Sequence, residues 1–223
     1  MTPVLWKWPE SALVGKVVPK IKFYEKAKIT TRLKEAFVAE VEQIDWAYKL
    51  SSQTLKIGAA GDLTEIQVFR ITAKVGQDVS SGVLEAIDAS VQTPIIFEEV
   101  CGEELRTRAA FKDMGPKGSR TGPRLEGDWV PGDTMRTQLP PALDLLGLYG
   151  QLIDPLLPLP RRPGESMSDA LARIDRVGVL DRDVKVLERK IANEPQLNRK
   201  LDIRRELMQR VAEYTALVTE VTD

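Results

Sequence analysis

The sequence predicts an α+β fold, in which a small, mainly antiparallel sheet packs with helices and is followed by a C-terminal antiparallel helical hairpin. Two observations predict it. Over residues 29–160, short runs of alternating apolar residues are interleaved with helical stripes. From residue 161 the apolar spacing changes to the three-and-four pattern of a coiled coil. We therefore expect an extended arm at 1–28, an α+β domain at 29–160 and a coiled-coil-like hairpin at 161–223.

The first 28 residues contain three prolines and are expected to form the extended arm. Four aromatic residues lie among its lysines: Trp6, Trp8, Phe23 and Tyr24. Aromatic rings interleaved with lysines can stack on bases or follow a phosphate backbone. More often such rings fix an arm onto its own domain, and we favour this second interpretation.

A helix is expected next, with Thr30 or Thr31 as its N-cap. Its apolar stripe, spaced by four, four and three residues, would consist of Leu33, Phe37, Val41 and Ile44. The alternating runs 53–57 and 65–71 flank a glycine-containing turn, and we expect them to form a β-hairpin.

The centre of the chain has short elements separated by turns. We expect a short helix around residues 83–87, capped by Ser80 or Ser81, and a buried strand at 93–97. Residues 112–124 are rich in glycine and proline and carry basic residues, which predicts a flexible basic loop. A short strand at 127–131 and irregular helical turns over 139–159 would complete this part.

Two amphipathic helices are expected at the C-terminal end. Ser166 or Ser168 would cap the first, whose seam is formed by Leu180, Val184, Leu187 and Ile191. Residues 193–196 break the pattern, and the second helix would resume the seam with Leu197, Leu201, Met208, Val211 and Val218. Arg204 stands where that seam requires an apolar residue. Helices joined by so short a break form an antiparallel hairpin.

Residue types that the sequence lacks exclude several chemistries. The chain has no histidine, so a Ser-His-Asp triad, a Cys-His dyad and a histidine-ligated zinc site are excluded. Its single cysteine, Cys101, cannot form an internal disulfide, which fits a reducing compartment such as the cytoplasm. There is no phosphate-binding glycine loop, no signal peptide and no apolar run long enough to cross a membrane. We therefore expect no cofactor, no metal site and no catalytic residue.

Eight short motifs, taken in order, resemble a bacterial family. They are PKIKFY (19–24), LKEAFV (33–38), IDWAYKL (44–50), EIQVF (65–69), VLEAID (83–88), PIIF (94–97), DWVP (128–131) and NRK (198–200). On these motifs the chain resembles the family catalogued as domain of unknown function 4391, over nearly its whole length. It departs from the family pattern at 106–111, where relatives tend to have an aromatic-rich strand.

The resemblance implies a setting rather than an activity. Members are often encoded beside helicases and DNA methyltransferases, in loci that look like restriction or anti-phage systems. The leading hypothesis is therefore a non-catalytic accessory subunit that binds a helicase or DNA methyltransferase of the same locus, with nucleic acid as a further ligand. Self-packing or homodimerisation of the hairpin stays open as an alternative.

Basic residues on the arm and on the loop are the candidate nucleic-acid contacts, because lysine and arginine on mobile segments suit phosphates. These candidates are Lys16, Lys20, Lys22, Lys117, Arg120 and Arg124. The candidate partner-binding residues of the hairpin are Arg189, Lys190, Arg199, Lys200 and Arg204.

Two other functions stay open. A metal-dependent nuclease needs acidic groups on neighbouring strands and a lysine that orients water. Its candidate residues are Glu65, Gln67, Asp88, Glu98 and Glu99, but no acid-x-Lys step follows them on a strand. An inhibitor or immunity-type protein is suggested by the thirteen acids against four bases between Glu35 and Leu105. The basic arm and hairpin argue against a pure nucleic-acid mimic.

Overall fold

The computed structural model of the chain describes residues 4–26, 29–59, 61–115 and 118–219, apart from the side chains of residues 26, 115 and 118–120. The chain divides into two compact units, Met1–Leu157 and Pro158–Asp223. The first unit combines a sheet with helices, and the second contains two long helices that pack against each other. The predicted α+β fold class is therefore confirmed.

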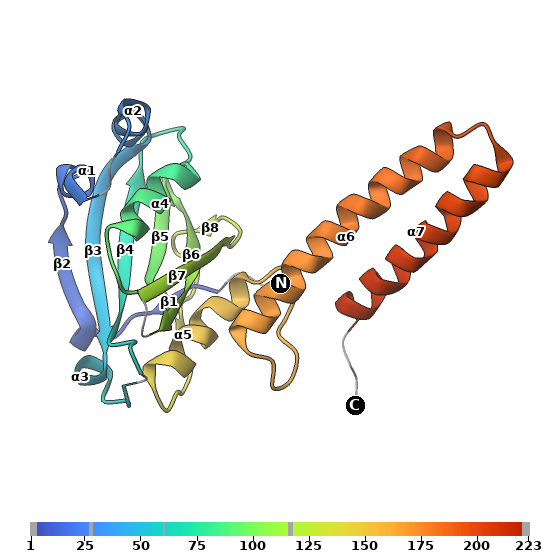
Figure 1. The fold of residues 1–223 in the computed structure, drawn as a ribbon. Coiled ribbons are helices and arrows are strands. Elements are labelled where there is room, and N and C mark those ends of the chain that lie inside the picture. The colour runs from blue at the N-terminus through green and yellow to red at the C-terminus, as the bar shows by residue number, and fades with distance from the viewer. Residues whose placement is uncertain (1–3, 27–28, 60, 116–117, 220–223) are drawn as a thin grey trace. The chain divides into compact units, whose positions relative to one another are not determined.

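The first unit is built around a seven-stranded sheet with the order β2-β3-β4-β5-β6-β7, while β8 pairs with β6 (Figure 1). Its strands are β2 (Leu13–Val17), β3 (Val41–Ser51), β4 (Glu65–Ala73), β5 (Ile95–Cys101), β6 (Glu104–Gly115), β7 (Gly118–Glu126) and β8 (Val130–Pro131). Neighbours run antiparallel except β4 and β5, which are parallel. Two short strands, β1 (Trp6–Lys7) and β9 (Thr137–Gln138), form a separate parallel pair. The sheet is thus mainly antiparallel.

Helices α1 (Ile21–Lys26), α2 (Thr31–Glu40) and α4 (Ser81–Ala89) share one hydrophobic core with the sheet. Helix α4 is the crossover that parallel neighbours such as β4 and β5 require. Its N-cap is Ser80, one of the two expected residues, although the Ser80 side chain makes no capping hydrogen bond. The buried side chains of this core include Phe23, Phe37, Val41, Ile44, Phe69, Ile71, Val83, Leu84, Ile87, Ile95 and Phe97.

Helix α5 (Leu145–Ile153) and the 3₁₀ turn η2 (Asp154–Leu156) form where irregular helical turns were expected. Tyr149 of α5 is fully buried, and its ring stacks on Phe111 of β6 with 5.7 Å between centroids. The Tyr149 hydroxyl donates to the carbonyl of Ala110 at 2.9 Å, and it accepts from the amide of Lys112 at 3.0 Å. These contacts fix α5 to β6.

The N-terminal segment differs from the expected extended arm. Its described part forms β1, the 3₁₀ turn η1 (Glu10–Ala12), β2 and α1, and β2 pairs with β3. Trp6 Nε1 donates to the carbonyl of Leu152 at 3.1 Å, and Trp8 Nε1 donates to Glu98 Oε1 at 2.7 Å. Both indoles are buried, so they attach the segment to its own domain, the interpretation favoured from the sequence.

The stripe that was expected to form one helix is divided between a helix and a strand. Thr30 is the N-cap of α2, and its hydroxyl accepts from the amide of Leu33 at 3.3 Å. The helix ends at Glu40, and Val41 begins β3, which pairs with β2 and β4. Residues 41–48 include β-branched and aromatic residues, which favour a strand. The helical spacing predicted a longer helix because Val41 and Ile44 of the strand are buried in the same core as Phe37 of the helix.

The predicted β-hairpin between residues 53–57 and 65–71 is wrong. Ser52–Leu55 form the short helix α3, and β4 pairs with β3 instead. Ser51 and Thr54 form a capping box, in which each side chain accepts a hydrogen bond from the other residue's amide. The capping box stabilises a helix start at this position, so residues 53–57 do not form the strand that the alternation of Leu55 and Ile57 predicted.

The predicted flexible basic loop at 112–124 is also wrong, because β6 and β7 form an antiparallel hairpin there. Its pairing extends from Arg108 opposite Glu126 to Gly115 opposite Gly118. Gly115 and Gly118 are the last pair of this hairpin. Pro123 is tolerated because β7 is an edge strand of the sheet.

In the second unit, α6 (Met167–Asn193) and α7 (Leu197–Val218) form the expected antiparallel hairpin. Ser166 caps α6 and accepts from the amide of Asp169 at 3.1 Å. Leu180 and Leu187 of the predicted α6 seam are buried.

The predicted seam of α7 is wrong, because most of it is exposed to solvent. Most half-buried residues of α7 follow a different stripe, and of the predicted seam only Val218 is half-buried among the described residues. The members of the different stripe are Lys200, Ile203, Leu207, Arg210, Tyr214 and Leu217. This stripe has the same three-and-four spacing, so the sequence pattern could not decide which of the two stripes meets α6.

Candidate functional site

The basic residues predicted to contact nucleic acid do not form one surface. Lys16, Lys20 and Lys22 lie in β2 and at the start of α1. Arg124 lies on β7. Strands β2 and β7 form opposite edges of the sheet, about 24 Å apart at the usual strand spacing. One nucleic-acid backbone would have to span the whole sheet to reach both groups.

Among the three lysines near the β2 edge, Lys16 and Lys22 are exposed, whereas Lys20 is engaged within the domain. Lys20 Nζ donates to the carbonyl of Val41 at 2.5 Å, which ties the start of α1 to the start of β3. Burial, assisted by the positive charge of Lys74, lowers the pKa of Lys20. The ammonium of Lys20 is therefore engaged in a hydrogen bond within the domain.

Arg124 is also turned inward. Its guanidinium lies over the ring of Phe97 at 5.9 Å, and its Nε and Nη1 atoms are buried without a hydrogen-bond partner among the described residues. Burial lowers the pKa of Arg124 below its ordinary value. The two other predicted loop residues, Lys117 and the side chain of Arg120, lie outside the described residues.

Glu98, a candidate for a nuclease site, is fully enclosed by donors. Its side chain is 1% exposed. Oε1 accepts from Trp8 Nε1 at 2.7 Å and from Arg136 Nη1 at 2.5 Å, while Oε2 accepts from Arg70 Nη2 at 2.8 Å. Burial alone would raise the pKa of Glu98, but the hydrogen bonds from Arg136, Arg70 and Trp8 hold it below the ordinary value. The carboxylate is therefore ionised, and its negative charge is balanced by Arg70 and Arg136.

Glu99 points to the other face of β5, as strand alternation requires. Its Oε1 accepts from the amide of Val79 at 2.9 Å. Its Oε2 accepts from Arg106 Nε at 2.9 Å and from Arg108 Nη1 at 3.1 Å. Arg106 also pairs with Asp78. Together these bonds hold the turn that leads into α4.

The opposite end of α4 is held by Lys112, which is buried on β6. Its Nζ donates to the carbonyls of Asp88 at 2.7 Å, Val91 at 2.5 Å and Thr93 at 3.3 Å. A cation at this position also suits the negative end of the helix dipole. The Asp88 carboxylate lies 3.4 Å from the ammonium. Burial raises the pKa of Asp88 and lowers that of Lys112.

The two remaining nuclease candidates are joined to each other. Gln67 Nε2 donates to Glu65 Oε1 at 2.7 Å, and Trp46 Nε1 donates to Gln67 Oε1 at 2.8 Å. Glu65 also pairs with Lys49 at 3.2 Å. Within the described residues, no cluster of three or more acidic or thiol side chains is placed to hold a metal ion.

An exposed apolar surface lies along α7 of the hairpin. Its side chains are Leu197 (70% exposed), Leu201 (43%), Met208 (67%) and Val211 (40%). Arg204 stands between them at the same helical spacing, exposed and without an ion pair or hydrogen bond to any described residue. We call these five residues the α7 stripe. None of the described side chains of α7 is buried.

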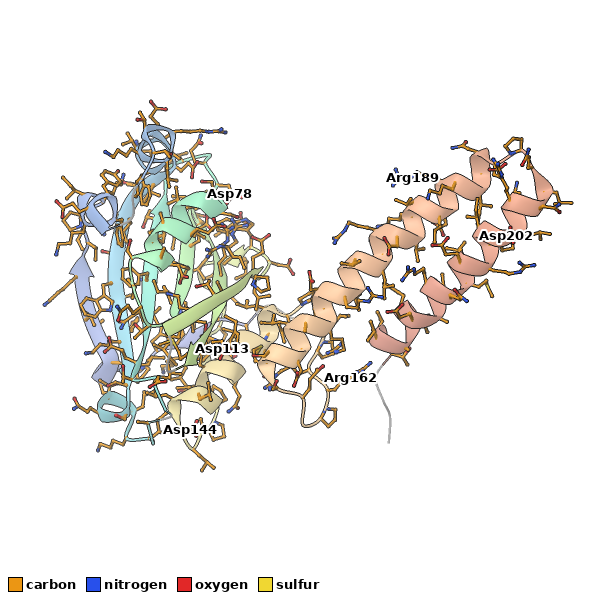
Figure 2. The ribbon with its side chains drawn as sticks, in the orientation of Figure 1. Asp78, Asp113, Asp144, Arg162, Arg189 and Asp202 are labelled. Atoms are coloured by element: carbon orange, nitrogen blue, oxygen red, sulfur yellow. The ribbon has the colours of Figure 1, made fainter. Side chains whose placement is uncertain are left out.

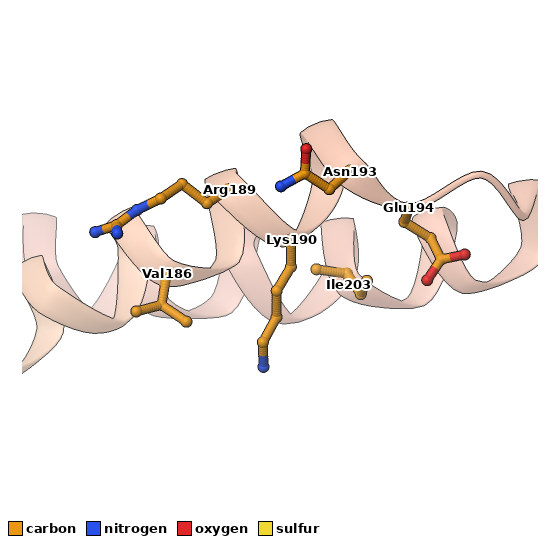
Figure 3. Close-up of a pocket in the computed structure, with 6 residues that line it drawn as sticks. All are labelled: Val186, Arg189, Lys190, Asn193, Glu194 and Ile203. Carbon is orange, nitrogen blue, oxygen red and sulfur yellow. The ribbon is translucent and has the colours of Figure 1, made fainter.

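A shallow cleft of about 430 Å³ lies near the tip of the hairpin, between α6 and α7 (Figure 3). It is lined by Val186, Arg189, Lys190, Asn193, Glu194 and Ile203. Two of the five predicted hairpin residues, Arg189 and Lys190, therefore meet at one place. The other three, Arg199, Lys200 and Arg204, lie along α7 and do not line the cleft.

The base of the hairpin contains an ion-pair cluster that the sequence did not reveal (Figure 2 labels Arg162). Arg173 donates to both carboxylate oxygens of Glu165, at 2.8 and 2.9 Å, and to the carbonyl of Leu217 at 3.2 Å. Arg162 donates its amide to Glu165 at 2.9 Å. The bonds from Arg173, assisted by Arg162, lower the pKa of Glu165 to about 2. Arg162, Glu165 and Arg173 lie close together in the sequence, at the start of the hairpin, and of these bonds only the one to the carbonyl of Leu217 depends on the pairing of α6 with α7.

Fold and surface together define a class: an α+β domain with internally paired buried charges and an appended two-helix hairpin that exposes an apolar stripe. The chain belongs to the family described as Domain of unknown function (DUF4391), whose model matches residues 7–213. No curated protein and no solved structure matches it. Within the part of the chain that is described, no helix has the length and apolar character needed to cross a membrane.

Proposed function

We propose that the chain is a non-catalytic accessory subunit of a bacterial anti-phage or restriction-like system and acts in the cytoplasm. In this role it binds a helicase or DNA methyltransferase of the same locus through the α7 stripe. The setting follows from the family resemblance described above. The observation that carries the binding role is the stripe itself, since its four apolar side chains are between 40% and 70% exposed. Contiguous exposed apolar surface on a protein marks an interaction site more often than an inert one.

The energetics support this role. Fully burying a side chain such as leucine or methionine contributes roughly 1.5–3 kcal/mol. Four such side chains together contribute several kcal/mol, enough to anchor a partner when a surrounding interface adds to them. Left uncovered, the same stripe favours self-association or aggregation, which is a reason to expect a ligand.

The nuclease alternative is disfavoured by the partners of its carboxylates. Glu98 and Glu99 point to opposite faces of β5, and each is neutralised by two arginines. Asp88 is matched by Lys112. A magnesium ion would have to displace the cations paired with these buried carboxylates, at a cost of several kcal/mol for each buried charge left unpaired.

The inhibitor alternative loses part of its motivation for the same reason. Three of the acids that gave the middle of the chain its negative balance, Asp88, Glu98 and Glu99, are buried. They add little to a surface field that could imitate nucleic acid.

Co-purification with the products of the neighbouring genes tests the proposal. The full chain should retain the helicase or methyltransferase, and the double variant Leu201→Asp/Met208→Asp should lose it. Val75→Asp is the control, because Val75 is an apolar residue outside the hairpin that is 92% exposed, more than Leu201 or Met208. Retention by the double variant, with circular dichroism unchanged, would exclude the α7 stripe as the binding surface.

A further inference from the structure

We infer that the occupant of the α7 stripe is an amphipathic helix of the partner protein, with apolar residues at heptad spacing and carboxylates on its flanks. This inference rests on the proposed function and adds the chemistry of the segment that is bound. Its basis is the combination of a second helical stripe on α7 with Arg204, which has no ion pair or hydrogen bond to any residue that the structure describes.

Helix α7 carries two apolar stripes on adjacent sides. The half-buried stripe includes Ile203, Leu207 and Leu217, and it is used within the hairpin. The exposed stripe is displaced from it by about a third of a turn. Met208 follows Leu207 by one residue and Leu201 precedes Ile203 by two, and each residue of an α-helix turns the side-chain direction by about 100°. A helix with two such seams is suited to a bundle of three or more helices. The exposed stripe could therefore pack against one more helix beside α7.

The charge on the stripe is basic at its N-terminal half. Arg204 lies within the stripe and has no ion pair with any described residue. Arg205 lies beside it and pairs with Asp202 at 2.8 Å, where both side chains are largely exposed (Figure 2 labels Asp202). Covering the stripe with a helix would remove water from Arg204. A buried charge is costly unless it is paired, so the covering helix should bring a carboxylate.

The acids of the hairpin do not meet this need. Glu213 already pairs with Arg176 at 2.5 Å and with Arg210 at 3.7 Å. Glu206 lies two residues from both Arg204 and Met208, which places it away from the stripe on the helix surface.

A second copy of the chain is a poorer occupant for the same reason. In a parallel pairing of two α7 stripes, Arg204 would face the arginine of the second copy. In an antiparallel pairing whose a and d residues pack in common layers, Arg204 would face Met208 or Thr215 of the second copy. Neither residue is acidic. Complementary flanking charges select helical partners, so a different, acidic helix fits better.

Two labelled 28-residue peptides test this with the full chain. Both carry leucine at heptad positions a and d; one has glutamate at e and g, and the other lysine. Because the like charges at e and g repel between two copies of the same peptide, each peptide stays monomeric at pH 7. By fluorescence anisotropy, the acidic peptide should bind at least about tenfold more tightly than the basic one. Leu201→Asp should abolish this binding.

A charge reversal gives the sharper result. Arg204→Glu should reverse the preference between the two peptides, while Arg182→Glu, an exposed arginine of α6 outside the stripe, should leave it unchanged. Equal binding of both peptides, or an unchanged preference in Arg204→Glu, would overturn the inference. The inference would also be overturned if the full chain forms a dimer in sedimentation velocity and Leu201→Asp abolishes that dimer. Binding to anionic lipid vesicles that Leu201→Asp abolishes would overturn it as well.

The failure of this inference can be told apart from failure of the proposed function. If the partner encoded in the locus is retained by the full chain and lost by Leu201→Asp, while neither peptide binds, the stripe is a docking surface of other chemistry. If neither the partner nor the peptides depend on Leu201, both proposals fail.

Discussion

Glu98 and Glu99 illustrate how single residues of β5 serve the two faces of the sheet. Glu98 joins the N-terminal segment to β4 through Trp8 and Arg70. Glu99 holds the turn before α4 through Arg106 and Val79. A buried ion pair adds little net stability over apolar packing, but removing one partner leaves an uncompensated charge. Both glutamates thus hold elements of the fold together, and we expect their removal to lower stability.

The residue Glu98 provides a direct test. Glu98→Gln keeps the shape of the side chain but leaves Arg136 and Arg70 without a counter-charge, so the free energy of unfolding should fall by about 3 kcal/mol. Urea unfolding followed by tryptophan fluorescence measures it. Glu103→Gln, at an exposed turn beside β6, is the control and should change stability by less than about 0.5 kcal/mol. A loss that small in Glu98→Gln would show that the pairs are not stabilising.

Glu165 predicts an acid sensitivity of the hairpin. Its pKa is lowered from 4.5 to about 2 by Arg173 and Arg162, so the folded state binds its proton less readily than the unfolded state. The stability it contributes, at most about 3 kcal/mol, is present above pH 4.5 and is lost as the pH falls toward 2.

Glu165→Gln should therefore lower the melting temperature at pH 7 and have much less effect near pH 2. Helical circular dichroism during heating, recorded at both pH values, measures this. The control is Glu188→Gln, an exposed acid of α6. An equal effect of Glu165→Gln at both pH values would mean that the carboxylate charge is not what holds the ends of the helices.

At the scale of elements, charged side chains from β6 fix both ends of α4. Arg108 donates to the carbonyl of Val79 at 2.7 Å just before the helix, and Lys112 donates to the carbonyls of Asp88 and Val91 at its far end. Arg106, Arg108 and Lys112 occupy alternate positions on β6 and reach the same face. These three basic residues are thus engaged within the first unit.

Among the described side chains of β2 and α1, the exposed lysines are Lys16 and Lys22, and we expect these two to limit nucleic-acid binding. With Lys20 bonded to Val41, Lys16 and Lys22 can supply about two phosphate contacts, which gives a slope of about −1.8 in log affinity against log salt. A fourfold rise in salt should then weaken duplex binding by about 12-fold. Fluorescence anisotropy with Lys16→Ala/Lys22→Ala and, as the control, Lys34→Ala measures this. A steeper slope that the double variant leaves unchanged would assign binding to other residues.

For the whole molecule, the boundary between Leu157 and Pro158 separates two compact units. The first has its own core, formed by side chains from α1, α2, α4 and the sheet. A fragment of residues 1–157 should therefore stay monomeric and melt cooperatively, which calorimetry and light scattering can check. The full chain is the control. Aggregation of the fragment would mean that the hairpin covers part of that core.

The sequence predicted elements best where a local signal was unambiguous. The N-caps were predicted to within two residues, as Thr30 or Thr31 and as Ser166 or Ser168, because a capping side chain bonds to an amide only three residues away. Thr30 and Ser166 are the caps in the structure. Elements were assigned wrongly where one pattern served two structures, as when Val41 and Ile44 continued a helical stripe into a strand. Of the candidate site, Arg189 and Lys190 do meet at one cleft, whereas Lys20 and Arg124 turn inward.

The sequence by itself determined the α+β class, the family and the absence of histidine chemistry, because composition, caps and motif order are local properties of the chain. Only the tertiary structure decided which charges are free, because a lysine or arginine is exposed or engaged according to strands far away in the sequence. It also decided which of two equally spaced stripes on α7 packs against α6. The stripe left over, with Arg204 unpaired, could be recognised only once its neighbour was in place.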